Sequence, residues 1–150
     1  MDLEQAYEKI YRYLYFKLRD KHLAEDLTQE SFLRYINQNR SVSHPEMKYL
    51  YTIARNLCID EYRRIKPSRL TEEDAESMIP DGTNMEEHIL LRDALERLTP
   101  EDREMLLLRY ANDERIGTIS ALLNQSRFST YRRLKSAEKH LRDAWEVSDK

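Results

Sequence analysis

The hydrophobic residues of the chain recur every three or four positions along most of its length, which is the period of an amphipathic α-helix. The first such segment predicts a helix over residues 3–19, with a buried stripe made of Leu3, Tyr7, Ile10, Leu14 and Leu18. Phe16 falls on the opposite side, so we expect it to be exposed or to contact another group. A second helix is predicted over residues 23–38 and a third over residues 46–65.

The predicted third helix has two distinct faces. Its expected core face consists of Leu50, Ile53, Ala54, Leu57 and Cys58. A second face, at spacings of three or four residues, carries Tyr49, Thr52, Asn56, Ile59 and Arg63. Such aromatic, hydroxyl, amide and guanidinium groups suit DNA backbone and base edges, although a solvated polar face has the same pattern. A polar loop over residues 37–45 precedes this helix and ends at a proline suited to a first helical turn.

The helical period is lost over residues 67–83, which contain Pro67, Pro80, Gly82 and most of the acidic excess of the chain. This composition predicts a linker. We therefore expect an all-α protein of two small helical lobes joined by an acidic linker. A three-helix lobe would occupy residues 1–66, and a helix-turn-helix lobe would occupy residues 84–150.

The second lobe begins with a predicted helix over residues 85–98. Thr99 then suits an N-cap and Pro100 suits a first helical position. The following helix, which contains residues 105–110, is apolar nearly all round and is expected at the centre of the lobe. A short helix over residues 116–123 should turn Ile116, Ile119 and Leu123 inward.

A turn at residues 124–126, with Ser126 as N-cap, is predicted to lead into a last helix over residues 127–146. Its expected buried stripe is Thr130, Leu134, Ala137, Leu141 and Trp145, and its outward face carries Phe128, Arg132, Lys135 and Lys139. A short helix, a tight turn and a longer helix with a basic face are the elements of a helix-turn-helix, although other helical hairpins look similar.

Composition agrees with a helical protein and limits its class. The 150 residues include only two glycines, and the single cysteine, Cys58, excludes an internal disulfide and a multi-cysteine zinc site. No apolar run approaches the roughly 20 residues that span a bilayer, and Met1 leads into a charged segment. We therefore expect a cytoplasmic protein without direct membrane insertion.

The net charge of −3 argues against nucleic-acid binding, but the charges are distributed unevenly along the chain. Residues 67–87 hold seven acidic residues and one basic residue, whereas residues 115–142 hold seven basic residues and one acidic residue. A basic segment behind an acidic stretch is expected when one part of a protein meets phosphate, although a solvated helix face gives the same imbalance.

An enzyme is the first alternative class. The four histidines, His22, His44, His88 and His140, are scattered, and none lies at metal-ligand spacing with the cysteine or a carboxylate cluster. The sequence also lacks a phosphate-binding glycine loop and a serine nucleophile motif. We expect no catalytic residues, no metal and no cofactor.

Two runs of sequence resemble a known family. Residues 24–36, AEDLTQESFLRYI, are similar to the polymerase-binding segment of bacterial sigma factors, and residues 49–64, YLYTIARNLCIDEYRR, are similar to their promoter-melting helix, which reads the −10 element. Together with a C-terminal helix-turn-helix and no intervening domain, they resemble the extracytoplasmic-function (ECF) group of the sigma-70 family. The resemblance covers nearly the whole chain outside the linker.

The resemblance implies a sigma factor that directs core RNA polymerase to promoters and helps to melt them. The expected partners are the clamp helices of the largest polymerase subunit, the flap of the second largest subunit, promoter DNA and a cognate anti-sigma factor. By position, the polymerase contacts would be Asp26, Gln29, Glu30 and Phe32. Asp26 and Glu30 are acids four residues apart, which repel each other on a helix and would be relieved by a basic partner, although a solvated acidic face is the simpler alternative.

The DNA contacts implied by the resemblance lie in both lobes. Contacts to the −10 element would be Tyr49, Thr52, Asn56, Arg63 and Arg64, with the loop over residues 37–45 capturing a flipped base. Contacts to the −35 element would be Arg127, Phe128, Ser129, Arg132, Arg133 and Lys135.

Some positions depart from the family pattern. Family members usually have tryptophan where Tyr49 stands, Glu-Ile-Ala where residues 118–120 read Thr-Ile-Ser, and basic residues at Ser136 and Glu138. Ser126, Arg133, Leu134, Ala137 and Leu141 fit the pattern. The departures in the second lobe affect the −35 contacts more than the fold.

Two further alternatives remain at this point. A stand-alone helix-turn-helix regulator would account for the second lobe and leave the first without a role. A helical protein-interaction module without DNA contact would leave the basic segment unexplained.

Overall fold

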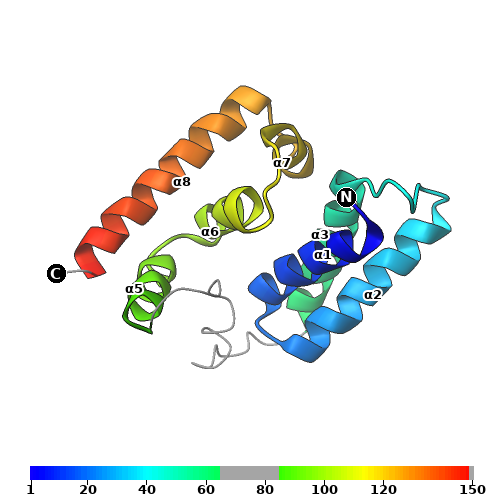
Figure 1. The fold of residues 1–150 in the computed structure, drawn as a ribbon, viewed down its shortest axis with the longest axis horizontal. Helices are drawn as coiled ribbons and strands as arrows, with labels where there is room; N and C mark the ends of the chain where they lie inside the picture. The colour runs from blue at the N-terminus through cyan, green and yellow to red at the C-terminus, as the bar shows by residue number, and fades with distance from the viewer. Residues whose placement is uncertain (65–84, 149–150) are drawn as a thin grey trace. The chain divides into compact units, whose positions relative to one another are not determined.

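The computed structural model describes residues 1–64 and 85–148, and every regular element in these two ranges is helical. The chain divides into two compact units, one containing each range (Figure 1). The predicted all-α class with two helical lobes is confirmed. The predicted linker, residues 67–83, lies outside the described residues, so the domain boundaries remain predictions.

The first unit consists of α1 (Leu3–Leu18), α2 (Lys21–Asn37) and α3 (Met47–Arg64), each of which packs against the other two. Asp2 begins α1 with a capping box, in which its carboxylate accepts the backbone N–H of Gln5 at 2.8 Å. Arg19 ends α1 in the left-handed conformation, and Asp20 then caps α2. The connection is therefore only two residues long, which makes α1 and α2 antiparallel neighbours.

Aromatic side chains fill the centre of the first unit. Tyr13, Tyr35 and Tyr51 are fully buried, and the rings of Tyr13 and Tyr51 meet edge to face with centroids 5.3 Å apart. The predicted stripe of α1 is correct for Ile10, Leu14 and Leu18. Leu3 is instead 37% exposed, because it lies in the first turn at the end of the unit.

The predicted core face of α3 is also largely confirmed. Leu50, Ala54, Leu57 and Cys58 are buried, and Ile53 is half-buried. Phe16 of α1 is half-buried.

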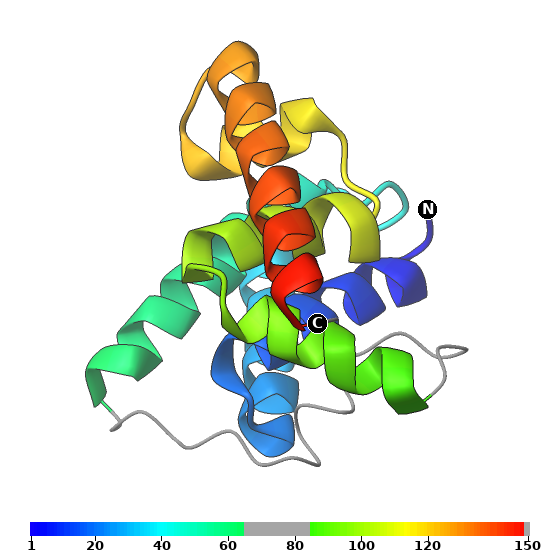
Figure 2. The same cartoon turned by 90° about the vertical axis from the view of Figure 1, so that its left-hand side faces the viewer.

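The second unit consists of α5 (Met85–Glu96), α6 (Pro100–Leu106), the π-helical turn η1 (Leu107–Ala111), α7 (Ile116–Leu123) and α8 (Arg127–Ser148). The long α8 contacts α5, α6 and α7 and so holds the unit together (Figure 2). Thr99 caps α6 as predicted, since its hydroxyl accepts the N–H of Asp102 at 3.2 Å.

The end of the central helix differs from the prediction. The N–H of Asn112 bonds to the carbonyl of Leu107, five residues back, at 2.9 Å, which widens the last turn into η1. Leu108 is buried, but Tyr110 is turned outward and is 61% exposed. The expectation that Tyr110 lies at the centre of the unit was therefore wrong, because the widened turn that contains it changes the direction of its side chain.

The inward and outward faces of α8 agree with the predicted periodicity. Thr130, Leu134 and Ala137 are buried, whereas Leu141 and Trp145 are half-buried towards the end of the helix. In α7 the buried residues are Ile119, Ser120 and Leu122, and the predicted Ile116 and Leu123 are half-buried. The two helices contact each other through these faces.

A cavity-creating substitution tests this core. Leu134→Ala should lower the free energy of unfolding by about 2–5 kcal/mol, because the side chain is 3% exposed and a small unit has little else to fill the space. Thermal unfolding followed by circular dichroism measures the change. Lys139→Ala, on the outward face of the same helix, is the control and should shift stability by no more than about 0.5 kcal/mol.

Candidate nucleic-acid and protein interfaces

The outward face of α3 presents the residues that the sequence predicts for DNA contact. Thr52, Asn56 and Arg63 are exposed, Tyr49 is half-buried, and the apolar Ile59 beside them is 41% exposed. They follow one another at spacings of three or four residues and so share one side of the helix. The structure therefore places on one side of the helix four side chains able to stack or to form hydrogen bonds, with the apolar Ile59 among them.

Two of the predicted α3 contacts already bond within the helix. The hydroxyl of Thr52 donates to the carbonyl of Lys48 at 2.7 Å, which leaves its methyl group and oxygen lone pairs for a ligand. Arg64 forms an ion pair with Glu61 at 3.2 Å, but its side chain remains 76% exposed. An exposed ion pair of this kind costs little to exchange for a phosphate.

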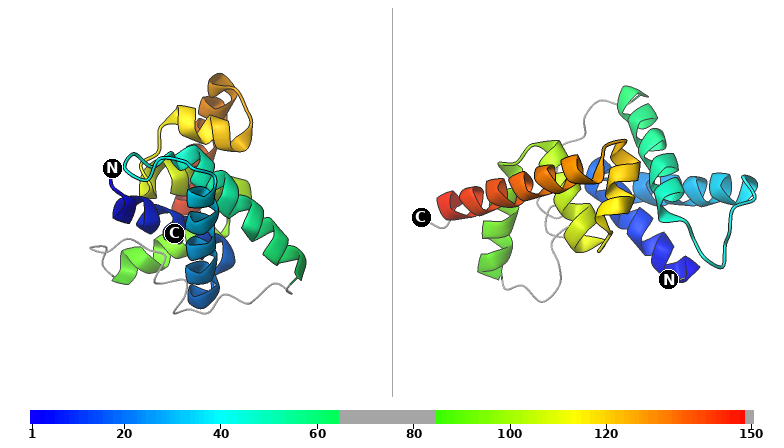
Figure 3. Two further views of the ribbon diagram at one scale, coloured as in Figure 1. Left: turned by 90° about the vertical axis from the view of Figure 1, so that its right-hand side faces the viewer. Right: turned by 90° about the horizontal axis from the view of Figure 1, so that it is seen from above.

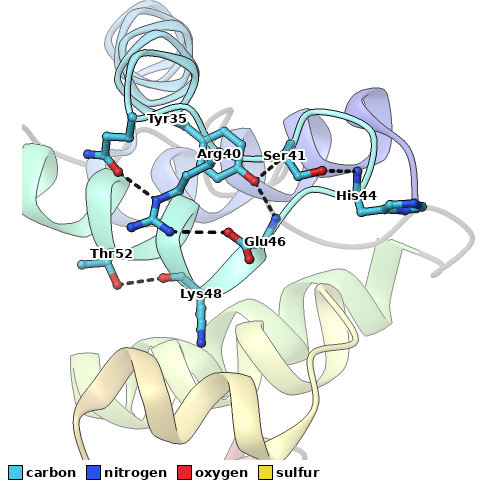
Figure 4. A network of polar contacts seen from close by, with 8 residues as sticks. Tyr35, Arg40, Ser41, His44, Glu46, Lys48 and Thr52 are labelled. Atoms are coloured by element: carbon cyan, nitrogen blue, oxygen red, sulfur yellow. Dashed lines mark hydrogen bonds and ion pairs between the residues drawn. The ribbon is translucent and has the colours of Figure 1, made fainter.

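The loop between α2 and α3, residues 38–46, can be followed in Figure 3, and a network of polar contacts holds it (Figure 4). The buried hydroxyl of Tyr35 donates to the carbonyl of Ser41 at 2.6 Å and accepts the N–H of Glu46 at 2.9 Å. The hydroxyl of Ser41 also accepts the N–H of His44 at 3.1 Å. The middle of the loop and its last residue are thereby tied to a fully buried side chain.

Arg40 in this loop is a candidate site residue that sequence reasoning missed. Its guanidinium carbon lies 3.4 Å from the centroid of the Tyr49 ring. The sequence offers no signal for this contact, since the loop has no period and the two residues lie on different elements. Only the folded path of the loop places them together.

The outward face of α2 carries the predicted polymerase contacts in different settings. Asp26 and Gln29 are exposed, but Glu30 is ion-paired with Arg34 at 2.9 Å on the next turn. The helix itself therefore supplies Glu30 with a basic partner, and the polymerase contact of Glu30 stays a prediction. Phe32 is only 7% exposed and packs on Tyr7, with ring centroids 5.5 Å apart.

Two exposed apolar residues lie on the same side of α2 and were missed from the sequence. Leu33 is 57% exposed and Ile36 is 45% exposed. Leu33 lies seven residues from Asp26 and four from Gln29, so these three side chains share a face. The sequence did contain a signal for Leu33, because an apolar residue whose helical neighbours are polar lies on the exposed face and away from the core.

The predicted helix-turn-helix elements are present in α7, the turn and α8. Asn124 ends α7 in the left-handed conformation with φ 56°. Ser126 then accepts the N–H of Ser129 at 3.0 Å and so caps α8 as predicted. The side chain of Arg127 lies against Gly117, where an added Cβ would be only 3.1 Å from its Nη2 atom.

The outward face of α8 combines aromatic rings with cations. Phe128 is 71% exposed, and the guanidinium of Arg132 lies 4.9 Å from its ring centroid. The ammonium of Lys135 lies 5.3 Å from the ring of Tyr131, which is 50% exposed. Arg133 is exposed and Ser129 is half-buried, each beside this face rather than at its centre.

An acid interrupts this basic face. Glu138 accepts hydrogen bonds from the hydroxyl of Tyr110 and from Lys135, the latter at 3.2 Å. The Tyr110 hydrogen bond, followed by the bond from Lys135, lowers the pKa of Glu138, and the Glu138 carboxylate in turn raises the pKa of Lys135. The contact also joins the η1 turn to α8, so the sequence departure at Glu138 has a structural partner.

Within residues 1–64 and 85–148, no group of three or more histidine, cysteine, aspartate and glutamate side chains is placed to hold a metal ion. No described helix is long and apolar enough to cross a membrane.

Known protein families match both units. Residues 3–67 match the family Sigma-70 region 2, and residues 88–141 match the family Sigma-70, region 4. The first match contains α1 to α3, and the second contains the helix-turn-helix.

Several curated proteins are similar over most of this chain. The chain is 30% identical to the ECF RNA polymerase sigma factor SigM of Bacillus subtilis over 137 residues, which cover 84% of each protein. It is 29% identical to the ECF RNA polymerase sigma factor BldN of Streptomyces coelicolor over 118 residues, 71% of this chain and 45% of BldN. The chain thus spans less than half of BldN but most of SigM.

A solved structure supports the fold. The sigma factor RpoE in its co-crystal structure with the anti-sigma factor NepR, from Bartonella quintana, matches with a TM-score of 0.71 at 16% identity, over 97% of this chain and 94% of RpoE. The helical arrangement, the matches to Sigma-70 regions 2 and 4 and the similarity to SigM all indicate the same family. The chain belongs to the ECF RNA polymerase sigma factors of the sigma-70 family.

Proposed function

We propose that this chain binds core RNA polymerase, directs it to promoters and assists promoter melting. The observation that carries the proposal is the exposed face of α3, where an aromatic ring, an amide and a guanidinium lie together in the unit that matches Sigma-70 region 2. The chain would supply contacts and no catalytic group, since the polymerase performs the chemistry. We also propose that it acts in the cytoplasm, where core polymerase is found.

Docking on the polymerase is assigned to the outward face of α2. Asp26 offers a carboxylate, Gln29 an amide and Leu33 an exposed apolar side chain. An apolar centre with polar neighbours is the usual composition of a protein interface, and burying it would supply affinity while the acid favours a basic partner. Phe32, buried against Tyr7, would act by holding α2 in place.

Promoter melting is assigned to α3 and the loop before it. Removing a base from the duplex costs a few kcal/mol of stacking, which the protein must replace by stacking and edge hydrogen bonds. Tyr49 offers the ring, Asn56 can donate and accept at a base edge, and Arg63 can bind phosphate. Arg64 would exchange its pairing with Glu61 for the DNA backbone.

Upstream binding is assigned to α8 and the first residues after the turn. Phe128, Arg132 and Lys135 lie outward and could enter the major groove, while Arg127, Ser129 and Arg133 flank them. Arginine reads guanine with two hydrogen bonds, and an aromatic ring can contact a thymine methyl. The flap of the second largest polymerase subunit is proposed as the second partner of this unit.

Regulation by an anti-sigma factor is part of the proposal. RpoE, which shares the fold, was solved in complex with the anti-sigma factor NepR. An inhibitor of this chain would need to cover the α2 or α3 faces described above, because these carry the exposed groups for polymerase and DNA. Transcription with purified core polymerase separates this proposal from a stand-alone regulator or a simple interaction module, since only a sigma factor confers promoter-dependent initiation.

Charge reversal on α2 tests docking. Asp26→Lys with Glu30→Lys should abolish association with core polymerase, because Asp26→Lys places a cation before a basic partner and Glu30→Lys replaces the ion pair with Arg34 by two neighbouring cations. Co-precipitation with purified core enzyme measures the loss. Glu4→Lys with Glu8→Lys makes the same change on exposed residues of α1 and is the matched control. Undiminished co-precipitation of the Asp26 and Glu30 variant would contradict the docking assignment.

Alanine on α3 tests strand separation. Asn56→Ala or Arg63→Ala should reduce open-complex formation while core binding remains, because both side chains are exposed on the face opposite the core. Permanganate reactivity of thymines is measured on a promoter first identified by sequencing transcript starts made with core enzyme and this protein. Unchanged reactivity in both variants would show that this face does not meet the melted strand.

Neutralising α8 tests upstream binding. Arg132→Ala with Lys135→Ala should weaken binding of the full chain to duplex DNA of the upstream promoter segment. The log–log salt dependence of the affinity should flatten by roughly 0.9 for each lost phosphate contact. Arg97→Ala, an exposed arginine on α5 paired with Asp93, is the control and should change neither quantity. Equal affinity and equal slope in the α8 variant would mean that the recognition face lies elsewhere.

A further inference from the structure

The contact between Arg40 and Tyr49 has the geometry of a stacked pair. The guanidinium carbon lies 3.4 Å from the ring centroid, which is the contact distance of two π systems. Arg40 belongs to the loop and Tyr49 to the first turn of α3. One face of the Tyr49 ring is therefore covered by a cation of the same chain.

Arg40 is also held by its edges. Its Nε donates to the side-chain oxygen of Gln38 at 3.0 Å, and its Nη1 lies 3.5 Å from a carboxylate oxygen of Glu46 (Figure 4). Only 31% of the Arg40 side chain is exposed. A guanidinium held by an amide, a carboxylate and a ring is fixed in direction rather than free to sample solvent.

The loop that carries Arg40 is itself fixed to the core. Tyr35, fully buried, bonds to the carbonyl of Ser41 and to the N–H of Glu46. Glu46 thus has its backbone fixed by Tyr35 while its side chain pairs with Arg40. The stack is preorganised by bonds on both sides, so no loop ordering is required when a ligand arrives.

A second cation lies near the same ring. The ammonium of Lys48 is 4.9 Å from the centroid of Tyr49. An aromatic ring beside cations is the composition of sites for single-stranded nucleic acid, in which bases stack on rings and cations meet the backbone. This ligand class is the one that the outward face of α3 already favours.

We propose that Arg40 is a positioning residue for Tyr49, and that the two act as one layer on which an unpaired DNA base stacks. Arg40 lies against the ring and fixes its orientation, and the base stacks on the part of the ring that Arg40 leaves exposed. The inference rests on the proposed function in one respect, that α3 meets separated DNA strands. It adds a residue and a geometry that the α3 face alone does not contain.

Two other roles for Arg40 predict different results. A direct phosphate contact would depend on its charge and would survive Arg40→Lys. A lid that blocks the ring until DNA displaces it would make Arg40→Ala bind more tightly. A positioning role requires the planar guanidinium, so both substitutions should weaken binding, and only while the Tyr49 ring is present.

The experiment is a double-mutant cycle in the complex with core polymerase. Affinity is measured by fluorescence anisotropy for labelled single-stranded oligonucleotides that the wild-type complex selects from a random-sequence pool. The variants are Arg40→Lys, Arg40→Ala and Tyr49→Ala, together with the double variant Arg40→Lys, Tyr49→Ala. Thermal unfolding of each variant confirms that the first unit remains folded.

The expected result is a roughly three- to tenfold loss of affinity for Arg40→Lys and Arg40→Ala, as for a partly desolvated cation–π contact. Arg40→Lys should then cost nothing further in the Tyr49→Ala background. Full affinity of Arg40→Lys, or tighter binding by Arg40→Ala, would overturn the positioning role. If Tyr49→Ala still lost affinity in that case, the proposed function would remain supported. Wild-type affinity of all four variants would count against both.

Discussion

The hydroxyl of Tyr35 joins the core of the first unit to its exposed loop, and the candidate DNA-binding surface depends on that connection. The ring is completely buried among the three helices, while its oxygen bonds to the carbonyl of Ser41 and the N–H of Glu46. A buried phenol needs polar partners, and here the backbone of the loop provides them. Because Glu46 pairs with Arg40, and Arg40 covers Tyr49, the packing of the core extends to the outermost ring of the site.

In the second unit, the backbone conformation of a short turn fixes the direction of the candidate DNA-binding helix. Asn124 reverses the chain in the left-handed region, and Ser126 immediately caps α8, so the turn between α7 and α8 needs only three residues. The buried stripe of α8, with Thr130 and Leu134, then fixes which residues face outward. A short, capped turn allows little freedom in the rotation of α8, and the direction of Arg132 follows from the same periodicity that buries Leu134.

Periodicity predicted the helices and their faces because each helix is amphipathic, and the split of α3 into a core side and a polar side is an example. It could not predict the Arg40 stack, because a loop has no period and its path depends on hydrogen bonds of the buried Tyr35 that no pattern in the sequence indicates. The family resemblance, and not periodicity, made Phe32 a polymerase contact, whereas the structure buries that ring against Tyr7. The π-helical turn was missed because an extra residue in one turn leaves no pattern in composition, and it moved Tyr110 from the core to the surface.

The position of Tyr110 in turn explains how an acid is accommodated on a basic helix face. An unpartnered carboxylate at Glu138 would repel phosphate, but this one accepts bonds from Tyr110 and Lys135, which lower its pKa and keep it charged. Lys135 must therefore give up its bond to Glu138 in order to bind DNA phosphate. The loss of this bond reduces the free energy that Lys135 gains from the phosphate contact. Within residues 1–64 and 85–148, Arg132 forms no ion pair that would be lost in the same way, and its guanidinium lies over the ring of Phe128. Of the two cations, Arg132 should thus contribute more of the affinity of α8 for DNA.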